Sequence, residues 1–225
     1  MFAGAATVGL LLAGVIWVFT RVLSDTADPA PAATTTSART SSTSSGSALA
    51  TAQRSLATCR AHVAAQERLA GAAADSARDW RTHTGAQLRL DSGAWTLAQA
   101  EAAWNASMDR GAADIRQFAE ATRALRGGAG SAACRSVVTD TASTELAEQG
   151  RSCAARDKAL SAVGSAGTVV NSQWAEHLVM MANKPHANAA DYHDRWVAMV
   201  AAAKEPLERH AVAAQALQRA PACGP

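Results

Sequence analysis

The residues best suited to chemistry in this chain are histidines that share a face of predicted helices. His83 and His177 each come three residues after a tryptophan, and Met181 follows His177 by one helical turn. Imidazole binds Zn, Cu, Fe or Ni, and a thioether shifts the preference towards Cu(I). Among the other histidines, we expect His62 on a solvated face and His210 in the core. The spacing therefore indicates a transition-metal site, with Cu or Zn as the candidate ion.

Helical periodicity brings a carboxylate and a third imidazole towards the same layer. Residues at 3-4 spacing define the inward face of each predicted helix, and His83 and His177 both fall on it. Glu101 in the second helix and His193 in the fourth occupy the matching level near the hairpin loops. Convergence from four helices is how bundles build interior metal sites. The alternative is that these groups only hydrogen-bond one another and fix the register of the helices.

The two halves of the chain repeat the same uncommon residues in the same order, and the first cysteine and tryptophan of each half keep the same spacing. In each half a cysteine is followed by a tryptophan after 21 residues, then by a second tryptophan and a closing cysteine. The matched residues are Cys59, Trp80, Trp104 and Cys134 in the first half, and Cys153, Trp174, Trp196 and Cys223 in the second. Such matches indicate an internal duplication. We predict two helical hairpins, 48–134 and 150–223, with the four tryptophans in the core.

The composition favours an all-α protein, because Ala, Arg, Gln, Glu and Leu dominate and lose little entropy in helices. We predict an up-down four-helix bundle over 48–225. The helices are expected at 47–90, 96–126 and 153–183 and from 188 onwards, with a linker up to about 150. Thr96 and Gln99 form a capping-box pattern, and Asn188 is a suitable N-cap. Pro206 lies inside the last helix and should kink it.

The cysteines are expected to form one disulfide in each hairpin. One cysteine begins the first helix of a hairpin and the other follows its second helix, so arms of similar length bring both to the open end. This favours Cys59 with Cys134 and Cys153 with Cys223. The rival pairing joins Cys59 to Cys223 and Cys134 to Cys153.

The N-terminal region reads as an anchor followed by a stalk. Residues 2–20 are uncharged and apolar, close to the roughly 20 residues that span a bilayer. We predict a transmembrane helix at 1–22, whereas cleavage within 27–32 would release a secreted protein. The Ser/Thr/Ala/Pro-rich segment 23–47 is a predicted disordered stalk. The stalk and the paired cysteines favour an extracytoplasmic body, although Arg21 alone favours the opposite orientation.

Residues 174–186 and 192–196 resemble uncharacterised membrane-anchored or exported helical proteins of high-GC Gram-positive bacteria. The resemblance implies an envelope location and no known activity. A net charge of +2 with mixed signs gives no basic face for nucleic acid. Phosphate loops, nucleophile elbows and HExxH motifs are absent from the sequence. We therefore expect a binding or interaction module, not an enzyme, with the membrane and an envelope protein as candidate partners.

Overall fold

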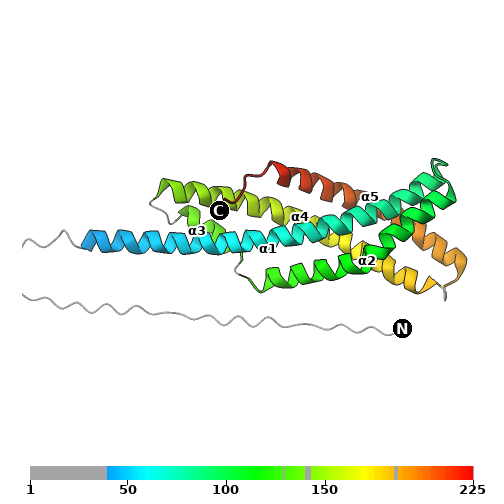
Figure 1. The fold of residues 1–225 in the computed structure, drawn as a ribbon, viewed down its shortest axis with the longest axis horizontal. Coiled ribbons are helices and arrows are strands. Elements are labelled where there is room, and N and C mark those ends of the chain that lie inside the picture. Colours follow the sequence, from blue (N-terminus) through cyan, green and yellow to red (C-terminus); the bar gives the residue numbers. More distant parts are fainter. Residues whose placement is uncertain (1–39, 129, 140–142, 185–186, 225) are drawn as a thin grey trace, which may run out of the picture. The chain divides into compact units, whose positions relative to one another are not determined.

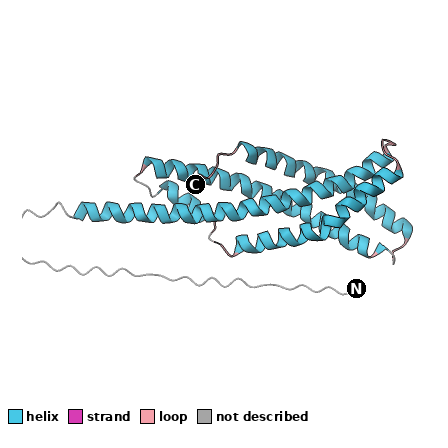
Figure 2. Cartoon of the chain, viewed as in Figure 1, coloured by secondary structure: helices cyan, strands magenta, loops and turns pink. Residues whose placement is uncertain are grey.

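The computed structural model describes residues 40–128, 130–139, 143–184 and 187–224, and the elements formed there are all α-helices (Figures 1 and 2). They are α1 (Thr40–Asp91), α2 (Leu97–Arg126), α3 (Ala132–Thr139), α4 (Thr144–Ala182) and α5 (Ala189–Arg219). The predicted all-α class is confirmed. The expected anchor at 1–22 lies outside the described residues. Among the helices that are described, none has the length and apolar character needed to cross a membrane.

Helices α1 and α4 form the central pair of a helical bundle. Helix α1 packs against each of the other four helices, and α4 packs against α1, α2, α3 and α5. Helix α2 returns along α1 as the first hairpin, and α5 returns along α4 as the second (Figure 1). The central pair therefore joins the two hairpins.

The capping residues read from the sequence are found at the expected helix ends. The hydroxyl of Thr96 accepts a hydrogen bond from the backbone N–H of Gln99, whose side chain accepts one from the Thr96 N–H. The side-chain carbonyl of Asn188 accepts from the backbone N–H of Ala190 at 2.8 Å. Pro206 lies inside α5 and is buried.

Two helical segments begin earlier than the sequence predicted, and one was not predicted. Helix α1 begins at Thr40, within the segment expected as a stalk. Helix α4 begins at Thr144 because Ser143 caps it and the following residues, Glu-Leu-Ala-Glu-Gln, are good helix formers. Helix α3 occupies part of the expected linker. The hydrophobic Val137 of α3 is fully buried, which explains why this segment is ordered against the body.

The predicted disulfide pairing is confirmed, and the rival pairing is wrong. Cys59 is bonded to Cys134 and Cys153 to Cys223, with sequence separations of 75 and 70. The chain-entropy relation gives about 4 kcal/mol of stabilisation for a loop of this size. Each hairpin is therefore a covalently closed loop.

The core has two main parts at different levels along the bundle. The first surrounds the cysteines and contains Leu56, Val63, Val137, Leu160 and Val163. The second surrounds the tryptophans and contains Ala77, Trp80, Val170, Trp174, Met180, Trp196, Val200, Ala203 and Leu207. His83 follows Cys59 by 24 residues, as His177 follows Cys153. At 1.5 Å per residue, these levels are about 36 Å apart.

Small residues bring the central helices together. A Cβ added at Gly167 of α4 would meet the Cβ of Ala73 on α1, and one at Gly164 would lie 3.2 Å from Leu69. Ala73 is itself completely buried. Because the atoms opposite Gly167 belong to a methyl group on a helical backbone, a larger side chain cannot be accommodated by a rotamer change.

We predict that Gly167→Ala destabilises the body even though alanine is the better helix former. Overpacking costs about 1–3 kcal/mol, against a gain in helix propensity of about 1 kcal/mol. Urea unfolding followed by circular dichroism measures the difference. Gly71→Ala is the matched control, since a Cβ there meets nothing within 4 Å, and it should stabilise the protein. Equal stabilisation by both changes would contradict the close contact between α1 and α4.

Candidate metal centre

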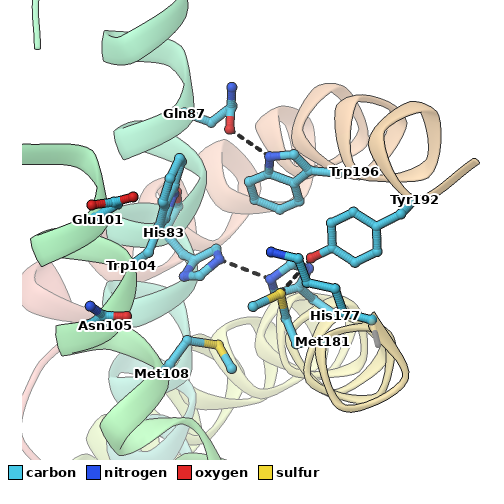
Figure 3. Close-up of a pocket in the computed structure, with 11 residues that line it drawn as sticks. His83, Gln87, Glu101, Trp104, Asn105, Met108, His177, Met181, Tyr192 and Trp196 are labelled. Atoms are coloured by element: carbon cyan, nitrogen blue, oxygen red, sulfur yellow. Dashed lines mark hydrogen bonds between the residues drawn. The ribbon is translucent and has the colours of Figure 1, made fainter. Parts of the chain in front are cut away.

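A cavity of about 410 Å³ opens at the end of the bundle that carries the tryptophans. Helices α1, α2, α4 and α5 and the turn after α4 contribute to its wall. The lining residues are His83, Gln87, Glu101, Trp104, Asn105, Met108, His177, Met181, Lys184, Tyr192 and Trp196 (Figure 3). The lining thus includes all of the predicted metal ligands except His193.

The two duplicated histidines face each other where α1 and α4 meet. The Nε2 atoms of His83 and His177 are 2.9 Å apart, and the residues are only 3% and 1% exposed. Figure 3 shows the hydrogen bond that joins the rings at the centre of the cavity lining. The structure therefore brings together the two residues that the repeat singled out.

The protons on the ring nitrogens are assigned from the hydrogen bonds of Ser107. Its hydroxyl donates to the backbone carbonyls of Ala103 and Trp104, at 2.9 and 2.8 Å. With its single proton used, Ser107 accepts from Nδ1–H of His83 at 2.8 Å. The Nε2 lone pair of His83 then accepts from Nε2–H of His177. This leaves a lone pair on Nδ1 of His177, an atom with no hydrogen-bond partner among the described residues.

Both imidazoles are held in the neutral form. Burial, together with the neighbouring His177, lowers the pKa of His83 to about 3. Burial lowers the pKa of His177 to about 4. Neutral imidazole is the form that binds metal ions. At neutral pH neither imidazole is in the charged, doubly protonated form, so a metal ion does not have to displace that extra proton.

Tryptophan rings enclose the imidazole pair. Trp80 stacks on His83 with ring centroids 6.2 Å apart, and Trp174 stacks on His177 at 5.8 Å. Trp80 and Trp174 are completely buried. Water is thus excluded from the inner faces of both imidazoles.

The other two tryptophans are fixed by hydrogen bonds at the cavity wall. Trp196 donates to the side-chain carbonyl of Gln87 at 2.6 Å, and Trp104 donates to the backbone carbonyl of His83 at 3.0 Å. All four predicted core tryptophans contact the imidazole region, although Trp104 is only half-buried. They hold the site's shape from four separate helices.

Thioethers supply the remaining soft donors. Tyr192 donates its hydroxyl proton to the sulfur of Met181 at 2.6 Å. Figure 3 shows Met181 beside the imidazole of His177, and Met108 below the two imidazoles in that view. Met181 follows His177 by four residues, so both project from one face of α4. The cavity therefore combines two imidazoles with two thioether side chains.

Two of the sequence-predicted ligands do not join the imidazoles. Glu101 is exposed, and Figure 3 shows its carboxylate at the edge of the cavity, apart from the imidazole pair. His193 is exposed and does not line the cavity, so its expected interior position is wrong. Tyr192 and Trp196, four residues apart, form the inward face instead. Counting back three residues from Trp196 gives His193 and counting back four gives Tyr192, and α5 uses the second register.

Two buried carboxylates, Asp79 and Asp114, lie beside the tryptophans and were not identified from the sequence. Asp79 is completely buried and receives two hydrogen bonds from Arg110, at 2.8 and 2.6 Å. Burial works to raise the pKa of Asp79, but the hydrogen bonds from Arg110 and Arg78 outweigh it and leave that pKa lowered. Trp174 donates to Asp114 at 3.2 Å. Burial and the charge of Asp79 raise the pKa of Asp114 to about 6.

No protein-family model, curated protein or solved structure matches this chain. The class of protein is therefore defined by the fold and the site alone, as an all-helical, disulfide-bonded bundle with a cavity lined by imidazole, thioether and indole groups.

We predict that the metal-free protein loses stability as the pH falls from about 8 to 5. When the pKa of a histidine is lower in the folded state than its unfolded value of about 6.5, the unfolded state binds a proton more readily as the pH falls. Protonation then favours unfolding. His83 and His177 should each lower the free energy of unfolding by about 2 kcal/mol at pH 5. His210, whose pKa is also lowered by burial, adds to the loss. Asp114 opposes it, because a raised pKa makes the fold take up a proton below about pH 6.

Urea unfolding at several pH values tests this dependence. His177→Gln should flatten the decline between pH 7 and pH 5, because one buried neutral imidazole is removed. His193→Gln is the matched control on an exposed histidine and should leave the slope unchanged. A slope that responds equally to both substitutions would contradict the assignment.

Proposed function

We propose that this chain is a membrane-anchored, extracytoplasmic binding module whose cavity takes one transition-metal ion, with Cu(I) preferred. The observation that carries the proposal is the pair of buried, neutral imidazoles with facing Nε2 atoms and a thioether one helical turn away. The apolar run at 2–20 and the two disulfides support the location.

A metal ion fits between the imidazoles after a small movement. Metal–nitrogen bonds of about 2.0–2.1 Å place two ligand nitrogens about 3.3 Å apart in a tetrahedral complex. The present separation is 2.9 Å, so the rings must part by about 0.4 Å and also turn, because both Nε2 lone pairs must point at the ion and not along the line between the nitrogens. Binding through both Nε2 atoms also moves the proton of His177 to Nδ1, where no partner now lies among the described residues. The metal therefore replaces the hydrogen bond between the rings.

The donor set favours a soft ion. Thioether sulfur selects Cu(I), whereas carboxylate oxygen suits harder ions. Met181 and Met108 lie by the imidazoles, and the carboxylate of Glu101 stands apart from them. Tyr192 occupies one of the two lone pairs on the sulfur of Met181, and the other lone pair is the one that would bind metal. This bond holds Met181 at the site in the absence of metal.

A second candidate function is a partner-binding envelope protein with no ligand, in which the polar layer only sets helix register. The short contact between His83 and His177 and the hydrogen bond that His83 donates to Ser107 favour it, because they satisfy three of the four ring nitrogens without a metal. Neither candidate function includes catalysis.

The deciding experiment is a metal titration of the full-length protein in detergent with both disulfides intact. Anaerobic competition with a chromogenic chelator should show one Cu(I) ion bound per chain, with weaker binding of Zn²⁺. Replacing both histidines, as His83→Ala with His177→Ala, should abolish binding. Met181→Leu conserves volume and should lower Cu(I) affinity at least about tenfold, a cost of about 1.4 kcal/mol, with little effect on Zn²⁺.

His193→Ala is the control for this series, because that histidine is exposed and outside the cavity. It should bind Cu(I) like the unchanged protein. Circular dichroism of each variant separates loss of the site from loss of the fold. Absence of binding at any loading would reject the metal proposal and leave the register role.

A further inference from the structure

The four cysteines form two disulfide bonds, and these two bonds lie next to each other in one cluster. The Sγ atoms of Cys59, Cys153 and Cys223 all lie within 4.8 Å of one another, and Cys134 is bonded to Cys59. These residues come from α1, α3, α4 and the segment after α5. Closing each hairpin needs only its own two cysteines to meet. The contact between the two disulfides is therefore an additional property of the structure.

We propose that the reduced cysteines form a tetrathiolate site for one divalent metal ion such as Zn²⁺. Two dithiol or phosphine equivalents reduce the two disulfides, and each disulfide takes up two electrons and two protons to give two thiols. The metal ion then displaces four protons and forms four metal–sulfur bonds. Structural zinc sites of this kind are tetrahedral and closed to further ligands.

The sulfur positions require little rearrangement. Zn–S bonds of about 2.3 Å place the sulfurs of a tetrahedral site about 3.8 Å apart. Three of the four sulfurs are already within 4.8 Å of one another. On reduction, both bonded pairs, Cys59 with Cys134 and Cys153 with Cys223, need to separate from bonding distance to about this spacing. Because the four sulfurs come from separate segments, the metal would link the same elements as the disulfides do.

A second cavity gives access to the cluster. It has a volume of about 570 Å³, and Cys134 lies on its wall with Arg135, Lys158 and His62. His62 is 8% exposed, so its expected place on a solvated face is wrong. Lysine and arginine beside a thiol favour the thiolate, which is the metal-binding form. Asp157 also lines this cavity, but its carboxylate is engaged by His62 at 3.1 Å and by Gln66.

This inference does not depend on the imidazole cavity, because the two sites lie about 36 Å apart along the bundle. It assigns a second use to the cysteines, which hold the hairpins as disulfides under oxidising conditions and as metal ligands under reducing conditions. The fold is then retained in both states.

The test uses the full-length chain carrying His83→Ala and His177→Ala, so that the imidazole pair cannot bind the added metal. After anaerobic reduction with a phosphine, Co²⁺ is titrated in and absorption is recorded. The expected result is sulfur-to-cobalt charge-transfer absorption that saturates at one ion per chain and is lost when Zn²⁺ displaces the cobalt. The oxidised protein should show no such absorption.

Thiol protection and helicity supply independent readouts. With Zn²⁺ bound, all four thiols should resist alkylation, as read by mass spectrometry. Cys153→Ser with Cys223→Ser should lower the intensity of the charge-transfer absorption, because each metal–sulfur bond contributes to it and only two thiols remain. If reduction unfolds the metal-free chain, Zn²⁺ should restore its helical circular dichroism. Absence of charge transfer, protection of two thiols or fewer, or failure of Zn²⁺ to restore lost helicity would each overturn the proposal.

Discussion

Helices α1 and α4 approach closely because Gly167 leaves room for the methyl group of Ala73, and the arrangement of the reactive side chains follows from that contact. Each helix carries its cysteine 24 residues before its histidine. Once the two helices pack in register, the cysteines meet at one level and the imidazoles at another. The repeated spacing in the sequence thus gives matched pairs of residues, and the α1–α4 contact brings the members of each pair together.

The repeated sequence was sufficient to predict the helical class, the disulfide pairing and the imidazole pair. These features depend on residues at fixed spacing within helices, where 1.5 Å of rise per residue gives their level directly. The capping residues Thr96 and Asn188 were predictable for a similar reason, since their hydrogen bonds are local. Local geometry and duplication therefore account for most of the correct predictions.

The sequence failed where rotation about a helix axis or contact between distant segments decides the outcome. His193 and Tyr192 differ by one position, and only the packing of α5 selects Tyr192 for the cavity. Asp79 was not identified because a carboxylate in a helix is usually solvated, and its partner Arg110 lies on another helix. The packing of α3 against α1 and α4 likewise depends on contacts far apart in the chain.

The positions of the disulfides determine how the bundle can deform. Cys59–Cys134 joins α1 to α3, and Cys153–Cys223 joins α4 to the segment after α5, so these elements cannot separate while the bonds are intact. The hairpin turns join the same arms at the opposite end, so each hairpin is covalently closed at both ends. The cavity is lined by residues from both hairpins, and its width therefore depends on how one closed loop sits against the other. The contact that sets this width, between α1 and α4, is noncovalent.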